Sequence, residues 1–226
     1  LDDQPSAIDI QDSIKENLTS DFSYSHTQEN LKEALVSVTE DPEEKNQIHF
    51  RFGLQMLFDA LDFIQAGKED QIILEKLKKY REDARSTIKD FTELSDEEQN
   101  NLFRTLLEQK IEELMFIRVL ENVAQDIPSV FSSLERLKVN LLWDVNTLIL
   151  AYEDRLNSDI AHIFYEQKND EFVQKSFLRE LTSLVSDDSV RNQLKRFEKY
   201  YLSNRVVELV KEDQVVTVEF AQLLLK

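Results

Sequence analysis

The chain has 226 residues, 41% of them hydrophobic, which is enough to bury a sizeable apolar core and excludes a disordered acidic tail. Its 45 acidic and 27 basic residues give a net charge of −18, so its surface repels nucleic acid and anionic lipid headgroups. The lack of Cys excludes disulfides and zinc–thiolate sites, and a total of 2 Gly argues against turn-rich β folds and nucleotide-binding folds.

The N-terminal part of the chain, residues 1–26, is polar and irregular, with one short helix expected over residues 7–18. A clear helical pattern begins at Thr27. Its apolar residues recur at helical spacing, namely Leu31, Ala34, Leu35 and Val38. We therefore expect an N-terminal extension followed by a first, short helix.

A pair of long helices is predicted between Asp41 and Phe91. Asp41 suits an N-cap, and Pro42 suits the first helical turn. Gly67 suits the left-handed turn that ends a helix, and a new helical pattern starts at Lys68. Two helices joined by so short a turn form an antiparallel hairpin.

Two further helices are predicted on either side of Pro128. Ser95 and Glu98 match the capping box S-x-x-E, which would start a helix that ends before Pro128. The helix that follows is long, and its apolar residues are spaced by three or four: Val130, Leu134, Leu137, Leu141, Val145, Leu148 and Tyr152.

The C-terminal third predicts shorter helices. We expect Trp143, the only Trp, to pack at a hairpin interface. A break is expected over residues 157–159, and the helical pattern resumes at Ile160. Another helix would start at Asp170 and carry the apolar residues Phe172, Phe177, Leu181 and Leu184.

Two segments of the chain resemble each other at a constant offset of 146 residues. Residues 31–41 align with residues 177–187, and both segments end in Asp. Without a gap, an Asn-Gln pair at residues 46–47 then aligns with an Asn-Gln pair at residues 192–193. The match indicates either an internal duplication or two helical hairpins that share the same period.

These patterns predict an all-α protein of antiparallel helical hairpins, packed as a bundle or as an elongated helical array. Residues 1–26 would be an N-terminal extension, and residues 27–126 a first helical unit. Residues 127–226 would be a second unit that repeats part of the first in degenerate form. The second copy reaches the end of the chain early, which fits either a longer protein or a shorter last helix.

Three features of residues 29–91 occur together in a known pattern. They are Asp41-Pro-Glu-Glu-Lys45 at a helix start, Gly67-Lys68 at the end of that helix, and Tyr80 in the next one. In these features the segment resembles an uncharacterised all-helical domain of bacterial extracytoplasmic proteins. That domain is found in secreted or cell-surface proteins of candidate-phylum bacteria and beside anti-sigma-type proteins. The resemblance implies an all-helical, secreted or cell-surface protein, and it implies no catalytic residue.

Few residues suggest chemistry at a site. A metal role for His49 would require ligands from other helices, so we interpret it as a residue at the edge of a helix face. Asp159, His162 and Glu166 are spaced so that they could share one helix face, which makes them the candidates for a metal site. The chain lacks the G-x-x-x-x-G-K-(S/T), G-x-S-x-G and H-E-x-x-H motifs. We expect no catalytic residue, no cofactor and no bound metal.

The resulting interpretation is a non-enzymatic extracytoplasmic structural or protein-interaction module, with an acidic surface and a protein partner held between hairpins. One alternative is a helical sensor or periplasmic chaperone-like domain. Others are a metal-binding or enzymatic bundle and a cytoplasmic adaptor. No nucleic-acid partner is expected, and no membrane span is expected because no apolar run approaches roughly 20 residues.

Overall fold

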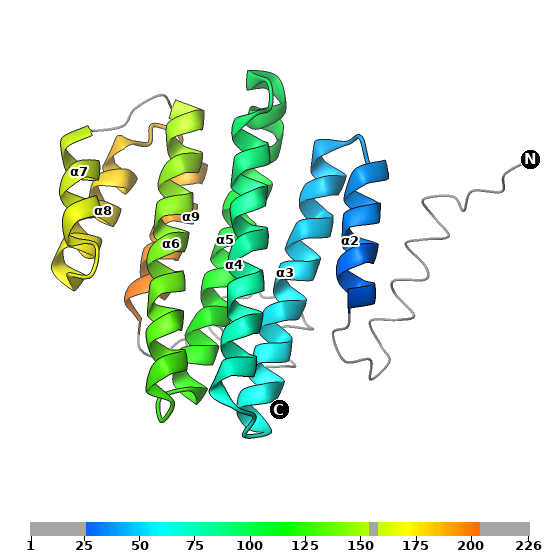
Figure 1. Ribbon diagram of the computed structural model, residues 1–226. Coiled ribbons are helices and arrows are strands. Elements are labelled where there is room, and N and C mark those ends of the chain that lie inside the picture. Colours follow the sequence, from blue (N-terminus) through cyan, green and yellow to red (C-terminus); the bar gives the residue numbers. More distant parts are fainter. Residues whose placement is uncertain (1–25, 154–157, 204–226) are drawn as a thin grey trace, which may run out of the picture.

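The structure is a computed structural model that describes residues 26–153 and 158–203 (Figure 1). These ranges contain eight helices and no strand, which confirms the all-α class. The helices are α2 (His26–Val38), α3 (Pro42–Gln65), α4 (Asp70–Thr92), α5 (Asp96–Val123), α6 (Pro128–Glu153), α7 (Ser158–Gln167), α8 (Glu171–Leu184) and α9 (Asp188–Leu202). The expected short helix over residues 7–18 lies outside the described residues.

The four longest helices, α3 to α6, stand side by side as the centre of a bundle (Figure 1). The hairpins α3–α4 and α5–α6 pack against each other through α3 on α5 and α4 on α6. The shorter helix α2 packs on α3 at one flank. At the other flank α9 packs on α5, α8 packs on α9 and α6, and α7 packs on α8. The bundle arrangement predicted from the hairpins is therefore confirmed.

Side chains and special backbone conformations define the helix ends. The Asp41 carboxylate accepts a hydrogen bond from the Glu43 backbone N–H at 2.8 Å, as an N-cap should. Gly67 adopts a φ of +61°, in the left-handed region that glycine tolerates best, directly after the end of α3. The Glu98 carboxylate accepts hydrogen bonds from the Ser95 backbone N–H at 3.0 Å and from its hydroxyl at 2.5 Å. The predicted starts and stops of α3 and α5 are thus confirmed.

One continuous apolar cluster fills the bundle and contains residues from α3 through α9. The apolar stripe predicted along α6 is buried against it. Trp143 of α6 stacks on Phe164 of α7 and on Phe177 of α8, with ring centroids 5.8 Å and 6.3 Å away. The prediction that this residue packs at a hairpin interface is confirmed.

The end of α2 and the start of α3 match the end of α8 and the start of α9 at the offset of 146 residues. Val38, at the end of α2, matches Leu184 at the end of α8. The buried faces of the second helices differ, however, because buried His49 matches exposed Lys195. The duplication and the division at residues 126 and 127 stay predictions. The single core crosses that division, and residues 204–226 lie outside the described chain.

Phe172 departs from the apolar stripe expected on α8, because its side chain is 77% exposed. The buried residues of α8 include Gln174, Leu178 and Leu181. Residues two apart on a helix point to nearly opposite sides, so burial of Gln174 turns Phe172 to solvent.

Candidate functional site

One cleft of about 500 Å³ lies where α3 and α5 begin and α4 ends. We call it the acidic cleft. It is lined by Val36, Glu40, Pro42, Lys45, Asn46, His49, Thr87, Asp90, Phe91, Glu93, Leu94, Glu98 and Leu102. Four of these residues are acidic, and one, Lys45, is basic. Aliphatic and aromatic side chains supply the remaining wall, so the cleft combines an apolar surface with an excess of negative charge.

The carboxylates of this cleft face solvent. The side chains of Asp90 and Glu93 are 51% and 65% exposed. Glu98 is also exposed, and the hydrogen bonds from the Ser95 hydroxyl and backbone N–H lower its pKa. Because hydrogen bonding to the ionised form favours ionisation, Glu98 remains negative into acidic solution.

His49 connects the acidic cleft to buried charges behind it. Its Nδ1 lies 3.2 Å from the Asp83 carboxylate, and its Nε2 lies 3.9 Å from the Asp90 carboxylate. The Lys32 ammonium donates to the same Asp83 oxygen at 2.6 Å. The sequence suggested only a residue at the edge of a helix face. The structure shows a 7% exposed imidazole between two carboxylates of α4.

Asn46 lines the acidic cleft beside His49 and is 4% exposed. Its Nδ2 donates to the Gln109 side-chain oxygen at 2.8 Å. Its Oδ1 is buried and accepts no hydrogen bond within residues 26–153 and 158–203. A buried acceptor without a donor costs about 1–3 kcal/mol, so a ligand that supplies a donor would recover part of that cost.

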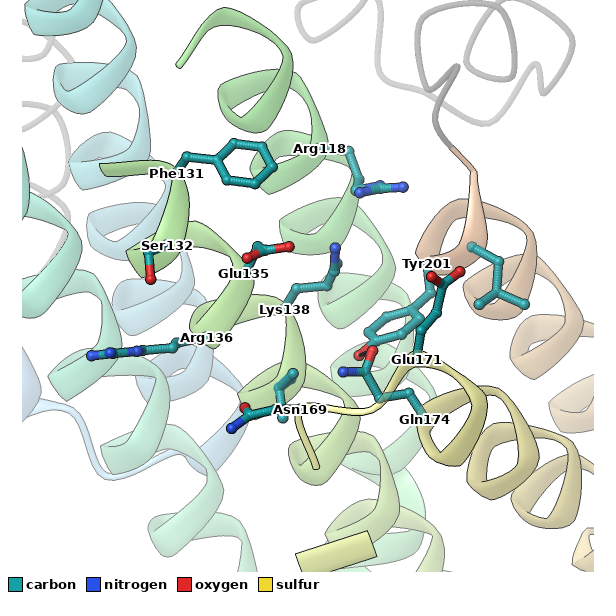
Figure 2. A pocket seen from close by; sticks show the side chains of 12 residues that line it. Arg118, Phe131, Ser132, Glu135, Arg136, Lys138, Asn169, Glu171, Gln174 and Tyr201 are labelled. Atoms are coloured by element: carbon teal, nitrogen blue, oxygen red, sulfur yellow. Dashed lines mark hydrogen bonds between the residues drawn. The ribbon is translucent and has the colours of Figure 1, made fainter. Parts of the chain in front are cut away.

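A second cleft, of about 540 Å³, lies between α5, α6, α8 and α9 (Figure 2). We call it the mixed-charge cleft. It is lined by Arg118, Phe131, Ser132, Glu135, Arg136, Lys138, Val139, Asn169, Glu171, Gln174, Tyr201 and Leu202. It therefore contains three basic and two acidic residues. Figure 2 shows that Arg136 points away from Lys138, so these cations do not converge.

The other two cations of the mixed-charge cleft already have partners. Arg118 and Lys138 both pair with the buried Glu121 carboxylate, the latter at 3.0 Å. Arg118 also donates to the Ser203 backbone carbonyl. The Lys138 ammonium lies 5.8 Å from the ring centroid of Tyr201, and the Tyr201 hydroxyl donates to Gln174 at 2.9 Å. These contacts join α5, α6, α8 and α9.

A third group of ionisable residues lies inside the core, between α4, α5 and α6. The Glu113 carboxylate accepts hydrogen bonds from the Lys110 ammonium at 2.9 Å and from the Tyr80 hydroxyl at 2.8 Å. Asp144 lies 3.9 Å from the same ammonium. Burial raises the pKa of Asp144 to about 7, and the Lys110 charge only partly opposes this shift. This group is packed within the bundle and lines neither cleft.

The residues that the sequence offered for a metal site lie on α7. The side chains of His162 and Glu166 are 73% and 62% exposed, and their closest nitrogen and oxygen atoms are 3.7 Å apart. The side chain of Asp159 lies outside the described residues. In the part of the chain that the structure describes, no three His, Asp or Glu side chains are grouped as ligands for a metal ion.

Comparison with known proteins identifies no relative of this chain. Neither a protein-family model, nor a curated protein, nor a solved structure matches the chain. Across the helices described, none combines the length and apolarity required to cross a membrane.

Proposed function

We propose that this protein is a non-enzymatic, extracytoplasmic protein-interaction module that holds a segment of a partner protein in the acidic cleft. The observation that carries the proposal is the make-up of that cleft. Apolar side chains such as Phe91 and Leu94 form its wall, while the carboxylates of Asp90 and Glu93 face solvent. Recognition sites for peptides combine apolar burial with charges that select the partner.

A non-enzymatic role is supported by where the ionisable side chains lie. The Lys110 ammonium and the Glu113 carboxylate, 2.9 Å apart, are buried in the core. Such a pair contributes to packing and specificity of the bundle without access for a substrate. The carboxylates that do reach a cleft line its solvent-exposed rim.

An extracytoplasmic location is supported by the features of residues 29–91 that resemble the bacterial helical domain. Two of those features have a structural role in this chain, since Asp41 caps α3 and Gly67 ends it. The acidic composition, with a net charge of −18, suits a soluble module with a basic partner.

Site-specific photo-crosslinking tests this function in the native organism. A photoreactive benzoylphenylalanine placed at Val36 or Leu94, both in the acidic cleft, should capture the same partner protein. The matched control is Ile72, which is partly exposed near the start of α4, at the opposite end of that helix from the cleft. The partner should be recovered from the envelope or the medium. Equal capture at all three positions, or recovery from the cytosol alone, would contradict the proposal.

A chaperone-like binding role is a second candidate, favoured by exposed apolar side chains at the other flank. Ile163, Tyr165 and Phe172 on α7 and α8 are 51%, 65% and 77% exposed. Large exposed apolar side chains on packed helices such as α7 and α8 can contact apolar clients. Substitution of all three by Ser should abolish suppression of client aggregation if this role is correct, and should leave capture at Val36 unchanged.

A further inference from the structure

Resting on the proposed function, we infer that the partner enters the acidic cleft with a cationic side chain, a lysine or an arginine, next to an apolar residue. The acidic cleft has four carboxylates and one ammonium, so with His49 neutral its formal charge is 1 − 4 = −3. An incoming cation is attracted by this charge, and an incoming carboxylate is repelled.

The wall of the cleft suits the stem of such a side chain. Val36 and Leu94 are partly exposed in the cleft, and the nearly buried Phe91 and Leu102 also line it. Lysine and arginine carry aliphatic stems that bury against apolar surface while the charged group reaches polar partners. The carboxylates of Asp90 and Glu93 stand at the rim of the cleft, where the charged group of an entering side chain would meet them.

The unpaired acceptor of Asn46 points to the same chemistry. Asn46 lines the cleft, and its buried Oδ1 accepts no hydrogen bond from the residues that the structure describes. An ammonium or guanidinium consists of donors only, so it can satisfy this oxygen, whereas a carboxylate cannot. Charge at the rim favours a cation, and the missing donor in the lining favours a ligand with a hydrogen-bond donor. Lysine and arginine meet both conditions.

The mixed-charge cleft should not share this preference for a cationic ligand. Its formal charge is +1, and Arg118 and Lys138 are held by Glu121. The same basic peptide should therefore not bind there.

A titration of the full-length protein with short synthetic peptides tests the inference. The probes are acetyl-leucyl-lysyl-leucine amide and its counterparts in which norleucine or glutamate replaces lysine. Norleucine keeps the aliphatic stem of lysine and removes its ammonium group. The readout is the NMR signal of the His49 ring, which lines the cleft. The ring of His162, exposed on α7, serves as a reference within the same spectrum.

The lysine peptide at millimolar concentration should shift the His49 signal and leave the His162 signal in place. The glutamate peptide should shift neither signal, and the norleucine peptide should bind at least about threefold more weakly. The variant Asp90→Asn/Glu93→Gln should weaken binding of the lysine peptide about fivefold. The matched control Glu75→Gln/Glu97→Gln makes the same change in net charge at exposed residues outside the cleft, and it should bind as the wild type does.

Equal binding of the lysine and norleucine peptides would overturn the cationic anchor. No shift of the His49 signal, or the same loss in both double variants, would overturn it as well. These outcomes are distinct from failure of the proposed function. If Val36 and Leu94 capture the partner with undiminished yield in the Asp90→Asn/Glu93→Gln variant, the cleft is the docking site and the cationic anchor is wrong. If the peptides bind but no partner is captured, the proposed function fails and the cation preference stands.

Discussion

The acidic cleft and the mixed-charge cleft have similar volumes but use their charged residues differently. In the mixed-charge cleft, Arg118 and Lys138 pair with the buried Glu121 and so tie α5 to α6. In the acidic cleft, the carboxylates of Asp90 and Glu93 are more than half exposed. The first set of charges is therefore part of the folded structure, whereas the second is available to a ligand.

The comparison shows that the number of charges around a cleft does not define what it can bind. Three basic residues surround the mixed-charge cleft, and this would suggest an anion site in an acidic protein. Two of them, however, share the buried Glu121 carboxylate as their partner, and Arg136 points elsewhere (Figure 2). A charged residue indicates the charge of a ligand only if its side chain is exposed and is not already paired within the protein.

The largest effect is expected for Glu121→Gln. Loss of this carboxylate leaves Arg118 and Lys138 close together without their shared counter-charge. Breaking a buried ion pair from one side typically costs about 3–5 kcal/mol, so we expect a loss of about 3 kcal/mol in the free energy of unfolding. Urea unfolding followed by circular dichroism measures this quantity.

Glu135→Gln is the matched control, because Glu135 lines the same cleft on α6 and is exposed. Its free energy of unfolding should change by less than about 0.5 kcal/mol. Similar losses in the two variants would mean that the Glu121 pairs contribute no more than surface charges, and the contrast between the two clefts would disappear.

A smaller effect is expected for Asp144→Asn. This variant tests whether the buried group around Lys110, and not a residue of either cleft, makes the stability of the protein depend on pH. Burial raises the pKa of Asp144 to about 7 from its ordinary value of 3.8. The Lys110 ammonium opposes this shift, as do the guanidinium groups of Arg85 and Arg81. The negative charge of Glu113 adds to it. A raised pKa means that the folded protein holds a proton that the unfolded chain releases. Its stabilising contribution is complete below pH 3.8 and is lost as the pH rises through about 7.

The wild type should therefore lose stability between pH 3.8 and about pH 7, and Asp144→Asn should lose less over the same range. At pH 8 we expect the variant to be more stable by about 1–2 kcal/mol, because its neutral amide avoids burying a second negative charge beside Glu113. Unfolding midpoints at a series of pH values provide the test. Parallel pH profiles for the two proteins would show that another group is responsible.

Much of the fold could be predicted because helix ends and helix faces are local properties. Asp41, Gly67 and Ser95 each act on a backbone turn within a few residues, and all three have the predicted role. Apolar spacing along α6 likewise predicts its buried face. Phe172 shows where this approach fails, since an apolar residue can match a helical period and still lie on the exposed side.

The acidic cleft could not be predicted, because its residues meet through tertiary packing. His49 reaches Asp83 of α4, 34 residues away, and Asn46 reaches Gln109 of α5, 63 residues away. Periodicity predicts which face of each helix is buried. It does not predict which faces pack together or how the helices are aligned along their axes. The polar residues Asn46 and His49 lie three apart at the buried side of α3, and this was the only local signal of a polar site.

A further, smaller effect is expected for Tyr201→Phe in the mixed-charge cleft. The substitution removes the hydroxyl that donates to Gln174 and keeps the ring beside Lys138. Loss of one buried hydrogen bond should lower the free energy of unfolding by about 1 kcal/mol. Tyr165→Phe on α7 is the matched control, because Tyr165 is exposed, and it should leave stability unchanged. A neutral result for both would show that α8 and α9 are held together without this bond.

The smallest effect on stability is expected for Asp90→Asn/Glu93→Gln, the same variant that should weaken binding of a basic peptide. Asp90 lies 3.9 Å from His49, and Glu93 lies 3.7 Å from Lys89 on an exposed surface. Both carboxylates are more than half exposed and are screened by water, so the free energy of unfolding should change by less than about 0.5 kcal/mol. The same urea titrations used for Glu121→Gln measure it. A change this small would show that these charges are not needed for folding, which leaves them available to a ligand. A large loss of stability would instead show that these carboxylates stabilise the fold, as Glu121 does in the mixed-charge cleft. They would then no longer support a cationic partner.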